Sequence, residues 1–169
     1  MRARWCGLVL AVVAAVAAGP ACAGGGVVTH VTDGDTLWVR MDGARAGAKP
    51  LKLRLQGIDA PERCQAWGPQ AHDALAGHVL KRRVDVQTKA RDVYHRAVAR
   101  VTLEGEDVGA WMVTHGHAWS DHPPHHRQGP YAAQEARARA GRRGLFSLPD
   151  PMEPKAFRRM HGACPSLRH

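Results

Sequence analysis

Apolar and polar residues alternate with a period of two along much of the first two thirds of the chain. Five segments show this pattern or are dense in Val and Leu, at 27–31, 37–41, 51–55, 84–88 and 93–103. Such segments are typical of short β-strands. In the third segment, Leu-Lys-Leu-Arg-Leu, the leucines alternate with Lys52 and Arg54. If the leucines face the core, Arg54 lies on the opposite face, where a site can form.

Three further segments carry apolar residues at helical spacing, at 69–80, 108–115 and 130–143. Pro69 suits the first turn of a helix, and Gly116 and Gly144 follow the second and third segments as stop signals. Strands with inserted and appended helices predict a mainly β, α+β chain. We expect a five-stranded oligonucleotide-binding (OB) barrel with about three helices, folded as a single domain.

The first 23 residues have the layout of an export signal. Arg2 and Arg4 precede an apolar run at 8–18, and Ala21-Cys22-Ala23 supplies small residues for cleavage. We therefore expect residues 1–23 to be removed and the protein to be periplasmic or secreted. Retention as an uncleaved anchor is the alternative. The mature chain would comprise a domain at 24–148 and a tail at 149–169, in which several prolines predict an extended backbone.

Removal of the signal changes the charge and the cysteine count. The net charge falls from +9 to +7, because Arg2 and Arg4 leave without an acidic residue. A basic chain binds polyanions, but this balance fits a passive binder of nucleic acid as well as an enzyme. Cys64 and Cys164 remain, and in an oxidising compartment we expect them to form a disulfide; two free thiols are the alternative.

Three short motifs supply the residue types that phosphodiester hydrolysis needs. They are Asp-Gly-Asp-Thr at 33–36, the segment from Arg54 to Glu62, and Arg-Asp-Val-Tyr-His-Arg at 91–96. Aspartates in the first two motifs offer the hard oxygen ligands that calcium or magnesium prefers. Glu62 can accept a proton from water. Arg54 and Arg96 match the geometry of a phosphate group. Taken singly, each residue also fits a turn, a bend or a surface ion pair.

The order and spacing of the three motifs resemble those of the staphylococcal nuclease (thermonuclease) family over roughly residues 27–146. The resemblance implies the OB-barrel fold and a calcium ion, although magnesium also fits the ligand types. The ion would be bound by Asp35, Asp59 and the main-chain carbonyl of Ala60, where the family often has Thr, with Asp33 acting through water.

The resemblance also assigns the catalytic groups and the substrate. Glu62 would be the general base, and Arg54 and Arg96 would stabilise the transition state. DNA and RNA would be the substrates, and the products would end in 3′-phosphates. We expect the enzyme to act as a monomer without an obligate protein partner.

Two positions in the region of the substrate depart from the family pattern. Tyr94 resembles a tyrosine that contacts a nucleotide phosphate, but His95 stands where the best-known relatives have Gly. Trp119 lies where the family has aromatic residues that stack on bases, but Ser120 and Asp121 follow it. Trp119 fits a core position equally well.

A histidine-rich stretch, Asp121-His122-Pro123-Pro124-His125-His126-Arg127, has no fixed spacing for chelating a metal. We interpret it as a solvated loop near the substrate groove. Two alternative functions remain open at this point: a non-catalytic nucleic-acid-binding barrel, and a periplasmic protein that binds a transition metal through this loop.

Overall fold

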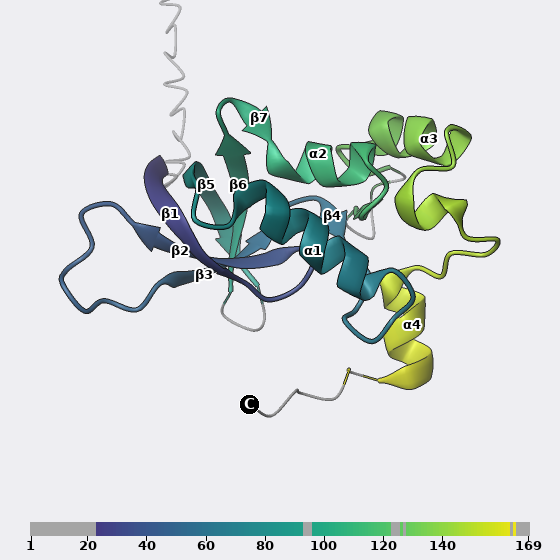
Figure 1. The fold of residues 1–169 in the computed structure, drawn as a ribbon, viewed down its shortest axis with the longest axis horizontal. Helices are drawn as coiled ribbons and strands as arrows, with labels where there is room; N and C mark the ends of the chain where they lie inside the picture. Colours follow the sequence, from purple (N-terminus) through teal and green to yellow (C-terminus); the bar gives the residue numbers. More distant parts are fainter. Residues whose placement is uncertain (1–22, 93–95, 123–125, 127, 163, 165–169) are drawn as a thin grey trace, which may run out of the picture.

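A closed barrel forms the centre of the computed structural model, which describes residues 23–92, 96–122, 126, 128–162 and 164 (Figure 1). Its five strands in this part of the chain are β1 (Ala23–Val31), β2 (Thr36–Met41), β3 (Leu51–Leu55), β5 (Arg83–Arg91) and β6 (Ala97–Leu103). Antiparallel neighbours follow the order β3-β2-β1-β5-β6, and a parallel pairing of β3 with β6 closes the ring. The predicted OB barrel is confirmed.

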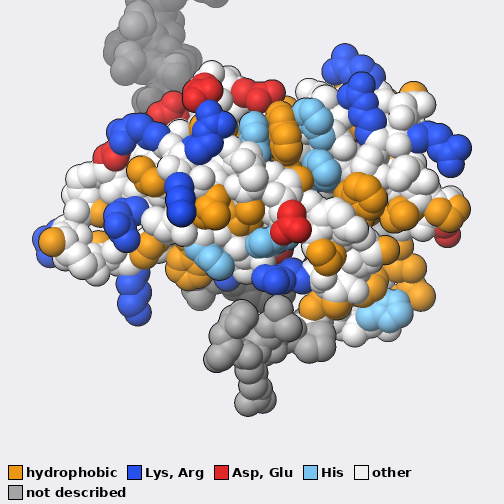
Figure 2. Space-filling view, viewed as in Figure 1, with side chains coloured by type: hydrophobic (Ala, Val, Ile, Leu, Met, Phe, Trp, Pro, Cys, Tyr) orange, Lys and Arg blue, Asp and Glu red, His pale blue; other side chains and the backbone are white. Residues whose placement is uncertain are grey.

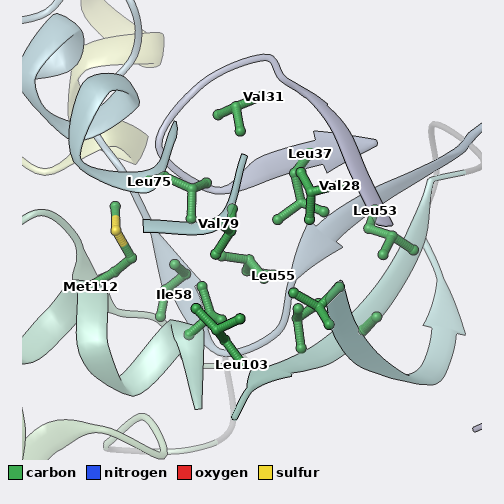
Figure 3. Packing of buried hydrophobic residues seen from close by; sticks show 14 of the residues in the cluster. Val28, Val31, Leu37, Leu53, Leu55, Ile58, Leu75, Val79, Leu103 and Met112 are labelled. Carbon is green, nitrogen blue, oxygen red and sulfur yellow. The ribbon is translucent and has the colours of Figure 1, made fainter. Parts of the chain in front are cut away.

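The alternating strand residues fill the interior of the barrel. Leu37 and Leu53 are fully buried there, close to Val28 (Figure 3). Helix α1 (Gly68–Val79) adds Leu75 and Val79 to the same cluster, and helix α2 (Val108–Thr114) adds Met112. One continuous core therefore joins the barrel to the two helices that pack on it, which makes the barrel a rigid support for side chains on its outer face.

Short strands extend this framework. Strand β7 (Glu106–Asp107) pairs with β6, whereas β4 (Ile58–Asp59) pairs with β8 (Trp119–Ser120) in a separate two-stranded sheet. In that small sheet Asp59 lies opposite Trp119. The pairing fixes Asp59 directly after the turn that follows β3.

The helices α1 and α2 nearly coincide with the predicted segments, but the third differs. Helix α3 (Ala132–Ala140) ends earlier than expected, because Arg142 adopts a left-handed backbone conformation with φ of 48°. Gly144 does not end the helix; it begins a 3₁₀ helix, η1 (Gly144–Ser147).

The expectation of an extended tail is wrong for residues 154–161, which form helix α4 (Pro154–His161). Pro154 lies in its first turn, where a missing backbone N–H costs nothing. The predicted disulfide is confirmed: Cys64 and Cys164 are bonded, with their Cα atoms 5.7 Å apart. It fastens the end of the chain to the loop after Glu62.

Histidine side chains gather over α1 and α2 (Figure 2). They surround Trp111: the ring of His78 stacks on it at 4.0 Å between centroids, and those of His115 and His117 lie at 4.4 and 5.9 Å. Trp67 donates a hydrogen bond from Nε1 to Nδ1 of His117, at 3.2 Å. We call these five residues the histidine–tryptophan cluster.

Residues 1–22 lie outside the described residues, so the export signal and the domain boundaries stay predictions. In the ranges that the structure describes, no helix is both long enough and apolar enough to cross a bilayer.

Candidate active site

The turn between β1 and β2 places the first acidic motif. Asp33 accepts a hydrogen bond from the backbone N–H of Asp35 through Oδ1, at 3.1 Å. A Cβ atom on Gly34 would lie 2.7 Å from the Cβ of Ala60 and 2.8 Å from that of Ala71. Only glycine lets the turn approach Ala60 and α1 this closely. The motif is therefore more than a hairpin turn: it brings Asp35 against the segment that contains Asp59.

Arg54 joins the two aspartates. Its side chain leaves β3 on the face opposite the buried Leu53 and Leu55, as the alternation predicts. Its Nη1 lies 2.6 Å from Oδ1 of Asp35, and its Nη2 lies 2.8 Å from Oδ1 of Asp59. One guanidinium thus binds two carboxylates from different parts of the chain, each in a charge-assisted hydrogen bond.

Asp35 is only 4% exposed. Its oxygens also accept hydrogen bonds from the hydroxyl of Thr36, at 3.0 Å, and from the backbone N–H of Ala60, at 3.1 Å. Burial raises the pKa of Asp35 from 3.8 to about 6, and this effect exceeds the opposing one of Arg54. Burial acts to lower the pKa of Arg54, but Asp35 and Asp59 together raise it above its ordinary value.

Glu62 lies in the loop that leads from β4 to α1. Its backbone N–H donates to Oε1 of Gln65, at 3.1 Å. A Cβ atom on Gly68 would lie only 2.0 Å from the carbonyl oxygen of Glu62. The start of α1 therefore packs directly on the Glu62 backbone, which holds this loop against the helix.

These residues line one cleft of about 630 Å³ together with Arg96. Arg96 lies just before β6, and its Nε donates to Oδ2 of Asp92, at 2.6 Å. The described residues that line the cleft are Asp33, Asp35, Lys52, Arg54, Ala60, Pro61, Glu62, Arg96 and Arg158. Asp59 lies beside the cleft, bound to Arg54. The structure thus brings together the predicted carboxylates and arginines of all three motifs.

Two cations of the cleft were missed by the sequence reasoning. Lys52 shares a face of β3 with Arg54, so the alternation already contained its signal. Arg158 comes from α4: its Nη1 lies 2.6 Å from Oε1 of Glu62, and its Nη2 lies 3.2 Å from Oδ2 of Asp59. The only sequence signal for Arg158 was the disulfide, which places the end of the chain near Glu62.

The remaining predicted residues differ in their placement. Tyr94 and His95 lie outside the described residues. Trp119 is 5% exposed and packs edge-on against Phe146, with ring centroids 5.9 Å apart. This placement supports the core interpretation of Trp119, because a ring that stacks on a base needs an exposed face. In the histidine-rich stretch His122 and His126 are exposed, and His125 lies outside the described residues.

Over the described ranges, no three side chains of His, Cys, Asp or Glu are grouped to hold a metal ion. The predicted ligand set is smaller, with two carboxylates and the carbonyl of Ala60. All three are hard oxygen donors, and among the described residues no imidazole or thiolate lines the cleft. This chemistry fits a calcium or magnesium ion better than a transition metal.

Residues 52–148, more than half of the chain, match the family model described as staphylococcal nuclease homologue. The chain belongs to the staphylococcal nuclease family. It is therefore a nuclease, a hydrolase that acts on the phosphodiester bonds of nucleic acid. The family resemblance is confirmed.

Curated relatives of the nuclease extend over most of its length. The nuclease is 38% identical over 144 residues to Protein ParB of Escherichia coli. The matched region covers 79% of this chain and 78% of that protein. An uncharacterized endonuclease of Haemophilus influenzae is 35% identical over 136 residues, with coverage of 78% and 71%. Micrococcal nuclease of Shigella flexneri is 33% identical over 147 residues, with coverage of 79% and 80%.

Proposed function

We propose that the nuclease hydrolyses DNA and RNA with the help of a divalent cation, calcium by family resemblance. The main support for this proposal is that Arg54 forms ion pairs with both Asp35 and Asp59. These ion pairs hold the two carboxylates beside one cleft. These two carboxylates and the carbonyl of Ala60 would bind the cation, with Asp33 acting through water. A bound cation would neutralise the phosphoryl oxygens of the substrate.

The other cleft residues supply the remaining parts of the reaction. Glu62 would accept a proton from the attacking water, whose oxygen forms a bond to phosphorus. Arg54 and Arg96 would stabilise the negative charge that develops on the phosphoryl group. The bond from phosphorus to the 5′ oxygen then breaks, which leaves a 3′-phosphate on one product and a 5′-hydroxyl on the other.

We also propose that the nuclease acts outside the cytoplasm, as a periplasmic or secreted enzyme. Two observations support this location: the signal-like segment at 1–23 and the disulfide between Cys64 and Cys164. Structural disulfides persist in oxidising compartments and are rare in the cytosol.

Cleavage assays on the mature chain, residues 24–169, test the function directly. Single-stranded DNA, duplex DNA and RNA would each be incubated with calcium, with magnesium and with a chelator. We expect calcium-dependent cleavage with 3′-phosphate ends, and its collapse in the variants Arg54→Ala and Glu62→Gln.

Binding of DNA by the same variants provides the control. Glu62→Gln keeps the size of the side chain, so this variant should still bind DNA in calcium without cutting it. If the wild type is folded and binds DNA but cuts none of the substrates with either cation, the proposed function is wrong and the chain is a binding protein.

A further inference from the structure

The C-terminal segment holds the loop that contains Glu62 at three points. The disulfide joins Cys64 to Cys164. Gln65 donates from Nε2 to the carbonyl of Met152 at 2.6 Å, while its Oε1 accepts from the N–H of Glu62. Arg158 binds the Glu62 carboxylate itself. These contacts link residues about a hundred positions apart, so the loop and α4 form one structural unit.

Among these three contacts, that of Arg158 involves a side chain with a proposed role in catalysis. Its side chain is 38% exposed and lines the cleft beside Glu62. Nη1 lies 2.6 Å from Oε1 of Glu62, and Nη2 lies 3.2 Å from Oδ2 of Asp59. The other oxygen of Asp59 is bound by Arg54. Asp59 thus lies between two arginines, and Glu62 is tied to Asp59 through one of them.

The orientation of Glu62 depends on such a tie. A glutamate side chain has three rotatable bonds. The contacts of Gln65 and Gly68 reach only the backbone of Glu62, so they do not fix these bonds. A guanidinium on Oε1 restricts those bonds and leaves Oε2 to meet the water. Since a misplacement of about 1 Å can cost roughly 100-fold in rate, this restriction matters for catalysis.

We propose that Arg158 is a positioning residue of the nuclease: helix α4, fastened by the Cys64–Cys164 disulfide, uses it to hold Glu62 in the orientation that accepts the proton from water. The inference rests on the proposed role of Glu62. It makes the C-terminal segment a part of the active site rather than a tail.

The contact of Arg158 with Asp59 adds a second testable effect, on the calcium dependence of activity. Asp59 is a proposed ligand of the cation, so Arg158 and the cation compete for its Oδ2. Removal of Arg158 should therefore lower the calcium concentration needed for half-maximal activity. At saturating calcium this competition vanishes, and only the loss of positioning remains.

The test compares kcat and KM for DNA at saturating calcium in the wild type and in Arg158→Ala, Arg158→Met and Arg158→Lys. We expect kcat to fall roughly 10- to 100-fold in the Ala and Met variants with little change in KM, because a positioning defect acts on the chemical step. Lys can still bind Glu62, although without the contact with Asp59, so Arg158→Lys should recover part of kcat.

Arg159→Ala is the matched control, because it removes the same charge from the next, exposed position of α4. It should keep the wild-type kcat. If Arg158→Ala keeps or exceeds the wild-type kcat at saturating calcium, Arg158 only competes with the cation and the inference is wrong. If the wild type itself cuts nothing with either cation, the proposed function fails instead.

Removal of the disulfide between Cys64 and Cys164 supplies a second measurement, which does not depend on a substitution of Arg158 alone. The double substitution Cys64→Ser and Cys164→Ser should lower kcat in the wild type, but should add little to the loss in Arg158→Ala, since both changes release the same carboxylate. Fully additive losses would contradict the proposal. Thermal melting of every variant, including Arg158→Met with its retained aliphatic length, separates these effects from unfolding.

Discussion

Arg54 uses two different nitrogens to bind two different carboxylates, at 2.6 and 2.8 Å. This arrangement depends on the planar fork of a guanidinium, because a lysine ammonium is a single point of charge. Asp35 is buried and lies close to Asp33, so its charge needs a fixed partner. Arg54 therefore has a structural task as well as its proposed role toward phosphate.

The substitution Arg54→Lys tests this dependence on the fork while keeping the charge. We expect activity to fall roughly 10- to 100-fold, since one ammonium cannot hold both aspartates and also bind a phosphoryl oxygen. Cleavage rates at saturating calcium measure the effect. The control is Arg40→Lys, at an exposed position of β2. Equal activity in the two variants would show that positive charge alone is sufficient at position 54.

Helix α1 contributes to the site through its first residue. Gly68 leaves no room for a side chain, because a Cβ atom there would meet the carbonyl of Glu62 at 2.0 Å. Gly77 lies in the same helix, exposed, with nothing within 4 Å of an added Cβ. One helix thus offers a glycine that the packing requires and another that it does not.

We expect Gly68→Ala to destabilise the fold by about 1–3 kcal/mol and to reduce cleavage, because the added methyl group must push the Glu62 loop away. Gly77→Ala should instead stabilise the fold by about 0.5–1 kcal/mol and leave cleavage unchanged, since alanine favours a helix. Denaturant unfolding and cleavage rates measure both. A Gly68→Ala variant with wild-type activity would mean that the loop adapts freely.

The two kinds of element differ in how far the sequence predicts them. Strand β3 follows from alternation, and the same alternation correctly placed Arg54 outside the core. The position of Glu62 followed from its motif. Helix α4 did not follow, because flanking prolines favour an extended chain and eight residues are too few for a helical spacing to stand out. Arg158 reaches Glu62 through tertiary packing, which local sequence does not encode; the predicted disulfide indicated only that the end of the chain lies near Glu62.

At the scale of the whole molecule, the site depends on contacts that close the chain on itself. The barrel positions Arg54, α1 supports Glu62 from one side, and α4 supports it from the other. The histidine–tryptophan cluster joins α1 to α2 and to the loop before α1. Because the barrel, α1 and α2 share one core, a change in the cluster affects the stability of the entire fold.

His117 gives that stability a dependence on pH. Its Nδ1 accepts a hydrogen bond from Trp67, so the ring is neutral with its proton on Nε2. Burial lowers the pKa of His117 below 6.5, and the nearby His115 lowers it further. As the pH falls below 6.5, the unfolded chain therefore binds a proton that the folded chain does not. The stability contributed by neutral His117 is present above this pH and is lost below it.

The substitution His117→Asn removes this titration but keeps an acceptor near the position of Nδ1. We expect the free energy of unfolding of the wild type, relative to that of the variant, to decrease as the pH is lowered from 7.5 to 5. Denaturant titrations across this range measure the difference, in which the shared titrations of other groups cancel. His30→Asn, at an exposed position of β1, is the control for the change from His to Asn. If His117→Asn runs parallel to the wild type, the proton uptake of unfolding lies elsewhere. His78 would then be the next residue to test, because burial lowers its pKa as well, against the opposing charge of Glu106.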